Sequence, residues 1–273
     1  MRIEKEAPIG VFDSGVGGLT VVRELMRNLP SEKIVYFGDT ARVPYGSKSK
    51  DTIIRYSRQI IRFLLEQEVK AIVVACNTAS ALALDVVKEE LEIPIIGVIE
   101  AGALIAAKET KNKRIGVIGT IGTVGSGIHE SYLKKFNPGV KVFGKACPLF
   151  VPLVEEGWLH DPITTEIATR YLEDLKEKSI DTLILGCTHY PLVRSTIRQV
   201  MGDEVRLVNP AYETALELSR LLKQEGILNP GEKNVEFPYQ FYVSDSEDKF
   251  RSFANSILPY DVEQTKKIDI EKY

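Results

Sequence analysis

Short apolar runs alternate along the chain with longer segments in which apolar residues recur every three or four positions. Helical spacing of this kind predicts amphipathic helices, and short apolar runs bounded by turn residues predict buried strands. The runs predict strands at residues 9–12, 33–37, 71–75, 95–98, 114–119, 140–146, 182–186, 205–208 and 240–243. The periodic segments predict helices at about 19–28, 53–65, 163–178, 192–201 and 211–225, others ending near 90 and 135, and a short one near 246–253. Strands that alternate with helices indicate βαβ units, and therefore an α/β fold with mainly parallel sheets.

The pattern restarts near the middle of the chain. The sequence Ile-Gly-Val-Phe at 9–12 aligns with Ile-Gly-Val-Ile at 115–118, and Ser14 then falls opposite Thr120. A cysteine follows each of these two residues after a comparable interval, 62 residues in the first case and 67 in the second. An internal repeat of two α/β units explains this correspondence, and chance similarity between two βαβ runs is the alternative.

The repeat predicts two pseudo-symmetric three-layer α/β domains, residues 1–98 plus 208–273 and residues 99–207. The tail that begins at Pro210 is expected to pack back on the first domain. Ligands of open parallel sheets bind outside the carboxyl ends of the strands. The active site is therefore expected in the cleft between the two domains.

Composition narrows the class of protein without identifying it. The 273 residues are 44% hydrophobic and 27% charged, with a formal net charge of -3, so no basic surface for nucleic acid or membrane is expected. No apolar stretch approaches the roughly 20 residues of a membrane span, and the charged N-terminus resembles no signal peptide. An odd, sparse set of three cysteines indicates free thiols in a reducing cytoplasm. No Cys/His spacing fits zinc, and no metal is expected.

Two cysteines stand at matching places in the repeat. Cys76 follows the run Ala-Ile-Val-Val-Ala and precedes Asn-Thr, while Cys187 follows Thr-Leu-Ile-Leu-Gly and precedes Thr-His. Each is predicted at a strand end where a helix begins, a place that favours the thiolate. Either cysteine alone could be a buried small hydrophobe, but the pair at equivalent positions favours chemistry. Cys147, next to Pro148, has no such setting and is interpreted as structural.

Several polar residues could serve these thiols, and each has a simpler interpretation. The loop Asp13-Ser14-Gly-Val-Gly-Gly matches neither a P-loop nor GxGxxG, so it is either a tight turn or a site where backbone N–H groups meet an anion. His189 could tune Cys187 or simply bond to backbone. Glu155 and Glu156 could form a solvated pair, and Tyr45-Gly46 a simple turn.

Two opposed thiols without an evident cofactor suit one reaction class best. Hydrolysis by a cysteine needs one thiol and a base, and a dithiol redox site needs adjacent sulfurs. Proton transfer at a stereocentre uses one thiolate to remove the α-proton and the opposite thiol to return one. The hydroxyls and amides of Ser14, Asn77, Thr78 and Thr188, with backbone N–H groups, could hold the charged groups of the substrate and stabilise the carbanion.

The motifs that carry this chemistry resemble those of glutamate racemase, in the cofactor-independent aspartate/glutamate racemase superfamily. They are Phe-Asp-Ser-Gly-Val-Gly-Gly-Leu at 12–19, Pro-Tyr-Gly at 44–46, Ala-Cys-Asn-Thr-Ala at 75–79 and Gly-Cys-Thr-His-Tyr-Pro at 186–191. The resemblance implies interconversion of L- and D-glutamate without pyridoxal phosphate or another cofactor, D-glutamate for peptidoglycan, and a homodimer.

The resemblance also implies a role for each matching residue. Cys187 would deprotonate L-glutamate with help from His189 and Glu155, although Glu156 is adjacent and the choice stays open. Cys76 would deprotonate D-glutamate with help from Asp13. The substrate would be held by Asp13, Ser14, Tyr45, Gly46, Asn77, Thr78, Thr188 and His189.

Three alternatives differ in what they require. An aspartate racemase would resemble Cys-Thr-Glu at the second motif, where this chain has His189. A non-catalytic binding protein of two α/β lobes would not need thiols at both strand ends. A nucleotide-binding enzyme built on the glycine loop lacks a partner motif.

Overall fold

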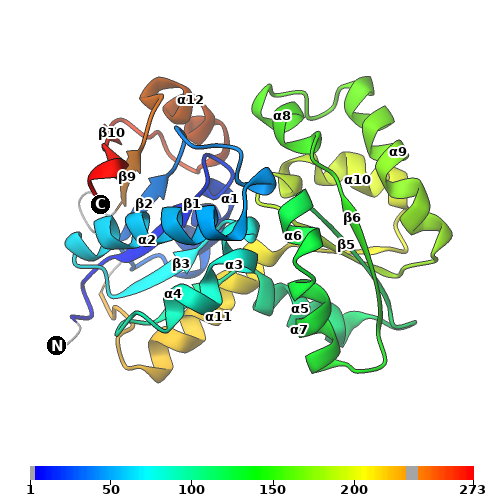
Figure 1. Cartoon of the computed structure of the whole chain (residues 1–273), viewed down its shortest axis with the longest axis horizontal. Helices are drawn as coiled ribbons and strands as arrows, with labels where there is room; N and C mark the ends of the chain where they lie inside the picture. The colour runs from blue at the N-terminus through cyan, green and yellow to red at the C-terminus, as the bar shows by residue number, and fades with distance from the viewer. Residues whose placement is uncertain (1–3, 232–238) are drawn as a thin grey trace.

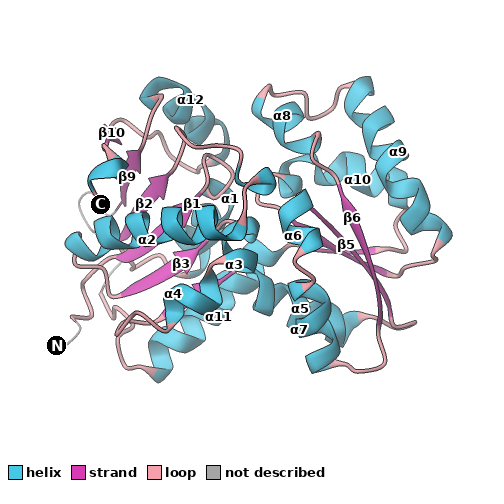
Figure 2. Ribbon diagram, viewed as in Figure 1, coloured by secondary structure: helices cyan, strands magenta, loops and turns pink. Residues whose placement is uncertain are grey.

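The computed structural model describes residues 4–231 and 239–273, and within these ranges the strands form two parallel sheets (Figure 2). The first sheet has the order β10-β9-β2-β1-β3-β4 and the second the order β6-β5-β7-β8. The strands are β1 Ile9–Asp13, β2 Ile34–Gly38, β3 Ala71–Val74, β4 Ile95–Gly97, β5 Arg114–Gly119, β6 Lys141–Ala146, β7 Thr182–Gly186, β8 Arg206–Val208, β9 Tyr239–Val243 and β10 Lys266–Lys267. The predicted α/β class with parallel sheets is confirmed.

The two sheets repeat one strand order. In the first sheet β1 lies between β2 and β3, with β4 beyond β3. In the second sheet β5 lies between β6 and β7, with β8 beyond β7. The repeat seen in the sequence is therefore a repeat of topology, and the predicted pseudo-symmetry is confirmed.

Helices cover both faces of each sheet, so each unit has three layers (Figure 1). Successive side chains of a strand point to opposite faces. Val11 of β1 thus packs toward α1 and α11, while Phe12 packs toward α2. The α-helices are α1 Leu19–Asn28, α2 Lys50–Glu66, α3 Asn77–Leu82, α4 Leu84–Lys88, α5 Ile99–Glu109, α6 Ile121–Gly125, α7 Ile128–Phe136, α8 Phe150–Glu155, α9 Pro162–Glu177, α10 Arg194–Met201, α11 Pro210–Gln224 and α12 Glu247–Ile257. Three 3₁₀ turns, η1 Tyr45–Ser47, η2 Tyr190–Val193 and η3 Ile270–Lys272, complete the described elements.

Several helical segments differ from the sequence-based expectation, among them α6, which forms ahead of the helix expected to end near 135. The segment expected as one helix ending near residue 90 is divided at Ala83 into α3 and α4. Helix α5 was not expected, because the run Ile-Glu-Ala-Gly-Ala-Leu-Ile-Ala-Ala has little amphipathic period. Its small residues instead pack on the second sheet while Gly102 meets Pro210 of α11, and a helix covered on several sides is apolar nearly all round. Helix α8 occupies an apolar run for which no helix was predicted.

The tail returns to the first sheet, as expected. Strand β9 pairs with β2 over its whole length, and β10 pairs with β9. Phe250 and Ala254 of α12 enter the same core as α1 and α11. Residues 1–3 of the charged N-terminus and residues 232–238 of the tail lie outside the described residues.

Candidate active site

A pocket of about 410 Å³ lies where the carboxyl ends of the two sheets face each other. Its walls come from the residues that follow β1, β3, β5 and β7, namely Ser14, Cys76, Thr120 and Cys187. The volume falls within the range of small-molecule sites, and the placement matches the rule for parallel sheets.

All but one of the predicted site residues line this pocket. They are Ser14, Tyr45, Gly46, Cys76, Asn77, Thr78, Glu155, Cys187, Thr188 and His189. The exception is Asp13, which is fully buried behind the pocket. The structure therefore brings together residues from two units that lie more than a hundred positions apart in the chain.

The first thiol lies beside a buried carboxyl group. Cys76 stands at the start of α3, and its Sγ lies 3.7 Å from Ser14 Oγ. Burial, and next the nearby Asp13, raise the pKa of the Cys76 thiol to about 12. Burial also raises the pKa of Asp13, although the N–H groups of Gly15 and Gly18 donate to its Oδ2 at 3.1 and 3.0 Å. This side of the pocket therefore favours a protonated thiol next to a group able to exchange protons.

The second thiol, that of Cys187, is the first of three polar groups in successive contact. Cys187 Sγ lies 3.8 Å from His189 Nδ1, and His189 Nε2 lies 3.1 Å from Glu155 Oε1. Burial lowers the pKa of His189, but the hydrogen bonds to Cys187 and Glu155 outweigh it and raise the pKa to about 10. The hydrogen bond with His189 in turn lowers the pKa of Glu155. A protonated imidazole next to the sulfur stabilises negative charge there, so the two thiols have opposite electrostatic settings.

The structure distinguishes the two adjacent glutamates by their distance from His189. Glu155 ends α8 and is partly buried against His189, whereas Glu156 is exposed beyond the helix end. Only Glu155 of the two lines the pocket. The contact singles out Glu155 as the carboxylate next to the imidazole.

Two threonines of the second unit belong to the site although no role was predicted for either. Thr78 Oγ1 lies 2.9 Å from Thr120 Oγ1 and 3.2 Å from Thr123 Oγ1, so a hydroxyl cluster joins the two halves of the pocket. The signal for Thr120 was present, because the repeat places it opposite Ser14. Thr120 caps helix α6, since its Oγ1 accepts from the N–H of Thr123, and no motif marks Thr123.

Glycines let the two halves approach closely. A Cβ on Gly17 would lie 2.5 Å from His189 Nδ1, and a Cβ on Gly46 would lie 2.6 Å from Thr120 Cβ. Real Cβ atoms do not come so near, so only glycine fits at these two positions. The loops after β1 and before α2 thereby touch the opposite unit directly.

The remaining candidate groups lie apart from the pocket. Cys147 is fully buried, its thiol pKa is raised to about 12 by burial, and it accepts a hydrogen bond from Tyr190 at its carbonyl. No cluster of three or more His, Cys, Asp or Glu side chains suited to a metal occurs among the described residues. Across the same residues, every helix is too short or too polar to cross a membrane.

Comparisons with known proteins, by sequence and by structure, agree on one family. The sequence model of the Asp/Glu/Hydantoin racemase family matches residues 9–217. A glutamate racemase of Geobacter metallireducens is 47% identical over 250 residues, 92% of each chain. The crystal structure of a glutamate racemase from Bacillus anthracis has a TM-score of 0.93 and 42% identity, over 97% of this chain and 98% of that one.

A glutamate racemase from Francisella tularensis, solved in complex with D-glutamate, has a TM-score of 0.91 and 41% identity, covering 98% of this chain and all of the other. These matches extend over both sheets and include every segment that lines the pocket. The chain therefore belongs to the glutamate racemases, within the Asp/Glu/hydantoin racemase family.

Proposed function

We propose that this racemase interconverts L- and D-glutamate by a two-thiol mechanism that needs no cofactor. The observation that carries the proposal is the pair of thiols at equivalent strand ends of two repeated sheets, both lining one pocket. A flat carbanion held between them would receive a proton from either face. The opposite electrostatic settings of the thiols supply one base and one acid at the start of a turnover.

In the L-to-D direction the Cys187 thiolate takes the α-proton, and the electron pair of the broken C–H bond moves onto Cα and the carboxylate. The Cys76 thiol then delivers its proton to the opposite face, which leaves Cys76 as thiolate and Cys187 as thiol. To restore the starting states, Asp13 donates a proton to the Cys76 thiolate and regains one from solvent, while Cys187 releases its proton to solvent because the His189–Glu155 pair stabilises its thiolate. In the D-to-L direction each thiol takes the other role.

Positioning and charge stabilisation fall to the polar lining of the pocket. Ser14, Asn77, Thr78, Thr188 and His189 would hold the carboxylate and ammonium groups, together with the Tyr45-Gly46 loop. Donors already aimed at the site need no reorganisation as charge develops on the carboxylate. His189 rather than glutamate at the third place of the second motif favours glutamate over aspartate as substrate.

We also propose the setting in which the enzyme works. D-glutamate made in the cytoplasm would supply peptidoglycan synthesis, and the chain would act as a homodimer, as the family resemblance implies. The domains would be residues 1–98 with 208–273 and residues 99–207. Light scattering of the purified protein measures the mass of the assembly, and a monomer at working concentration would refute the dimer.

The mechanism is tested by racemisation in D₂O without added cofactor. A two-thiol enzyme labels D-glutamate at Cα as it forms, while the remaining L-glutamate stays unlabelled early in the reaction, because the proton removed and the proton delivered sit on different sulfurs. Cys76→Ala and Cys187→Ala should each abolish turnover, and Cys147→Ala should retain it. Full activity in either of the first two variants would exclude the two-thiol mechanism, and racemisation of aspartate but not glutamate would exclude the substrate.

A further inference from the structure

A buried carboxylate lies just outside the pocket, at the end of β2. Asp39 is fully buried, and its backbone N–H donates to the carbonyl of Asp13 at 3.1 Å. Burying a carboxylate is costly unless donors surround it. Its side-chain partners are therefore informative: two come from the loop that follows β2 and one from the distant C-terminal tail.

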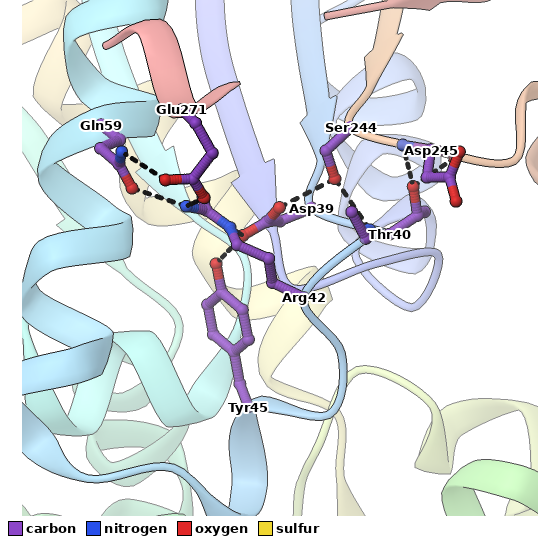
Figure 3. A network of polar contacts seen from close by, with 9 residues as sticks. Asp39, Thr40, Arg42, Tyr45, Gln59, Ser244, Asp245 and Glu271 are labelled. Atoms are coloured by element: carbon purple, nitrogen blue, oxygen red, sulfur yellow. Dashed lines mark hydrogen bonds and ion pairs between the residues drawn. The ribbon is translucent and has the colours of Figure 1, made fainter. Parts of the chain in front are cut away.

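The first partner belongs to the pocket itself. The hydroxyl of Tyr45 donates to Asp39 Oδ2, and Figure 3 shows the ring pointing away from the loop toward this carboxylate. Burial, and next the charge of Asp39, raise the pKa of Tyr45 well above its usual value, so the hydroxyl keeps its proton and stays a donor. Tyr45 is only 2% exposed. The hydroxyl of Tyr45 is therefore used in the hydrogen bond to Asp39. This bond fixes one side chain of the Tyr45-Gly46 loop, which lines the pocket.

The second partner comes from the C-terminal tail. Ser244, directly after β9, donates from Oγ to Asp39 Oδ1 at 2.8 Å and accepts from the N–H of Ala41 at 2.8 Å. The tail next exchanges two hydrogen bonds with Thr40, whose hydroxyl donates to the carbonyl of Asp245 and accepts from its N–H at 2.9 Å. The N–H of Ser244 also donates to the carbonyl of Gly38 at 3.1 Å, so the chain is tied to the tail on both sides of Asp39.

An arginine completes the cluster. Arg42 donates from Nε to Asp39 Oδ2 at 2.7 Å, while its Nη1 reaches Gln59 of α2 and Glu271 of η3, the latter at 3.0 Å (Figure 3). Its guanidinium lies 4.0 Å above the ring of Tyr56, which packs against Tyr45 with ring centroids 5.6 Å apart. The cation is therefore fixed on one side by the tail and on the other by an aromatic ring.

We propose that Asp39 is a positioning residue for the racemase: with Ser244 and Arg42 it anchors the Tyr45 hydroxyl and so sets the place of the Tyr45-Gly46 loop in the substrate pocket. The tail then acts on catalysis without touching substrate, through the chain from Ser244 to Asp39 to Tyr45. The loop faces the opposite unit across Gly46 and Thr120, where an added Cβ would lie 2.6 Å from the threonine. A small displacement of the loop would therefore change the shape of the pocket.

The inference rests on the proposed function, and the test keeps the two apart. Tyr45→Phe removes the anchored hydroxyl and keeps the ring. We expect the KM for both glutamate enantiomers to rise about tenfold, because the loop loses the hydrogen bond to a charged group that holds it in position, and a bond of this kind is worth about a factor of ten or more. The change in kcat should be smaller, because a loop that contacts substrate throughout the reaction contributes to ground state and transition state alike.

Tyr56→Phe is the matched control. Its ring neighbours that of Tyr45, but its hydroxyl has no hydrogen bond among the described residues. KM should stay within about twofold of the parent value in this variant. Ser244→Ala removes the tail's bond to Asp39 and should raise KM by a smaller factor than Tyr45→Phe. The double variant Tyr45→Phe/Ser244→Ala should show less than the product of the two single effects, because both act through one carboxylate.

Thermal unfolding measured alongside separates positioning from loss of structure. An unchanged KM in Tyr45→Phe would overturn the inference if the parent racemises glutamate. Equal KM changes in Tyr45→Phe and Tyr56→Phe that follow the fall in Tm would overturn it as well, since packing alone would then explain them. A parent enzyme that fails to racemise glutamate would overturn the proposed function and the inference built on it.

Discussion

Replacing Glu155 by glutamine should move the alkaline limb of the pH–activity profile toward neutral pH. The hydrogen bonds to Cys187 and Glu155 hold the pKa of His189 at about 10, against an ordinary value of 6.5. If the starting state for L-glutamate is a Cys187 thiolate beside a protonated His189, activity is present below the pKa of His189 and falls as pH rises through it. Any change that lowers this pKa therefore costs activity first at high pH.

The size of the shift follows from the contact that is lost. Glu155 Oε1 lies 3.1 Å from His189 Nε2, and a hydrogen bond between charged groups contributes about 1.5–3 kcal/mol, or roughly one to two pKa units. A fall of about 1.5 units would leave the protonated fraction at pH 7.5 almost unchanged but reduce it roughly eightfold at pH 9.5. The loss relative to the parent enzyme should thus grow steeply with pH.

The assay measures kcat/KM for L-glutamate from pH 6 to 10.5, with circular dichroism to detect racemisation. The pH dependence of kcat/KM reports the pKa values of the free enzyme. Glu156→Gln is the control, since this exposed neighbour carries the same charge but lies outside the pocket. An alkaline limb that stays in place in Glu155→Gln, or that moves as far in Glu156→Gln, would refute the assigned role of Glu155.

Three further outcomes are expected. Gly17→Ala should lower kcat/KM by about tenfold or more, because the added Cβ would lie 2.5 Å from a ring nitrogen across the cleft, whereas Gly125→Ala, with nothing within 4 Å, should not. Asp13→Asn should lower kcat by about 10²–10⁴ if this carboxyl exchanges protons with the adjacent thiol, with thermal unfolding showing that the fold is kept. Lys70→Met should destabilise the fold by about 3–5 kcal/mol in urea unfolding, because it leaves the buried Glu32, now 2.5 Å from the Lys70 Nζ, without its cation. Adding Glu32→Gln should recover part of that loss, and no recovery would mean that the pair is not the cause.

The parts of the fold that could be predicted are those whose pattern lies within a single segment of the sequence. The apolar runs of β1, β3, β5 and β7 are buried on both faces, and their sequences have this pattern throughout. The two thiols could be placed because each follows such a run directly. The strand order could be expected in outline, since the second unit repeats the first.

The parts that could not be predicted depend on distant contacts. Helix α5 has no amphipathic pattern because neighbouring helices cover it on several sides. The choice of Glu155 over Glu156 depends on where α8 ends relative to His189, which lies 34 positions further along. The strand that leads to Asp39 could be predicted, but the role of this residue depends on Ser244, 205 positions away. No pattern within one segment contains that information.

The late return of the tail to the first sheet has a consequence for synthesis on the ribosome. The second sheet uses one continuous stretch, from Arg114 to Val208, so it can assemble as soon as that stretch has emerged. The first sheet has strands β1 to β4 made before that stretch, yet its edge strand β9 is made after it, and long-range pairings of this kind form slowly. The anchor of Tyr45 therefore forms only after the whole second sheet has been made, and a nascent chain gains a complete pocket only once Ser244 has emerged.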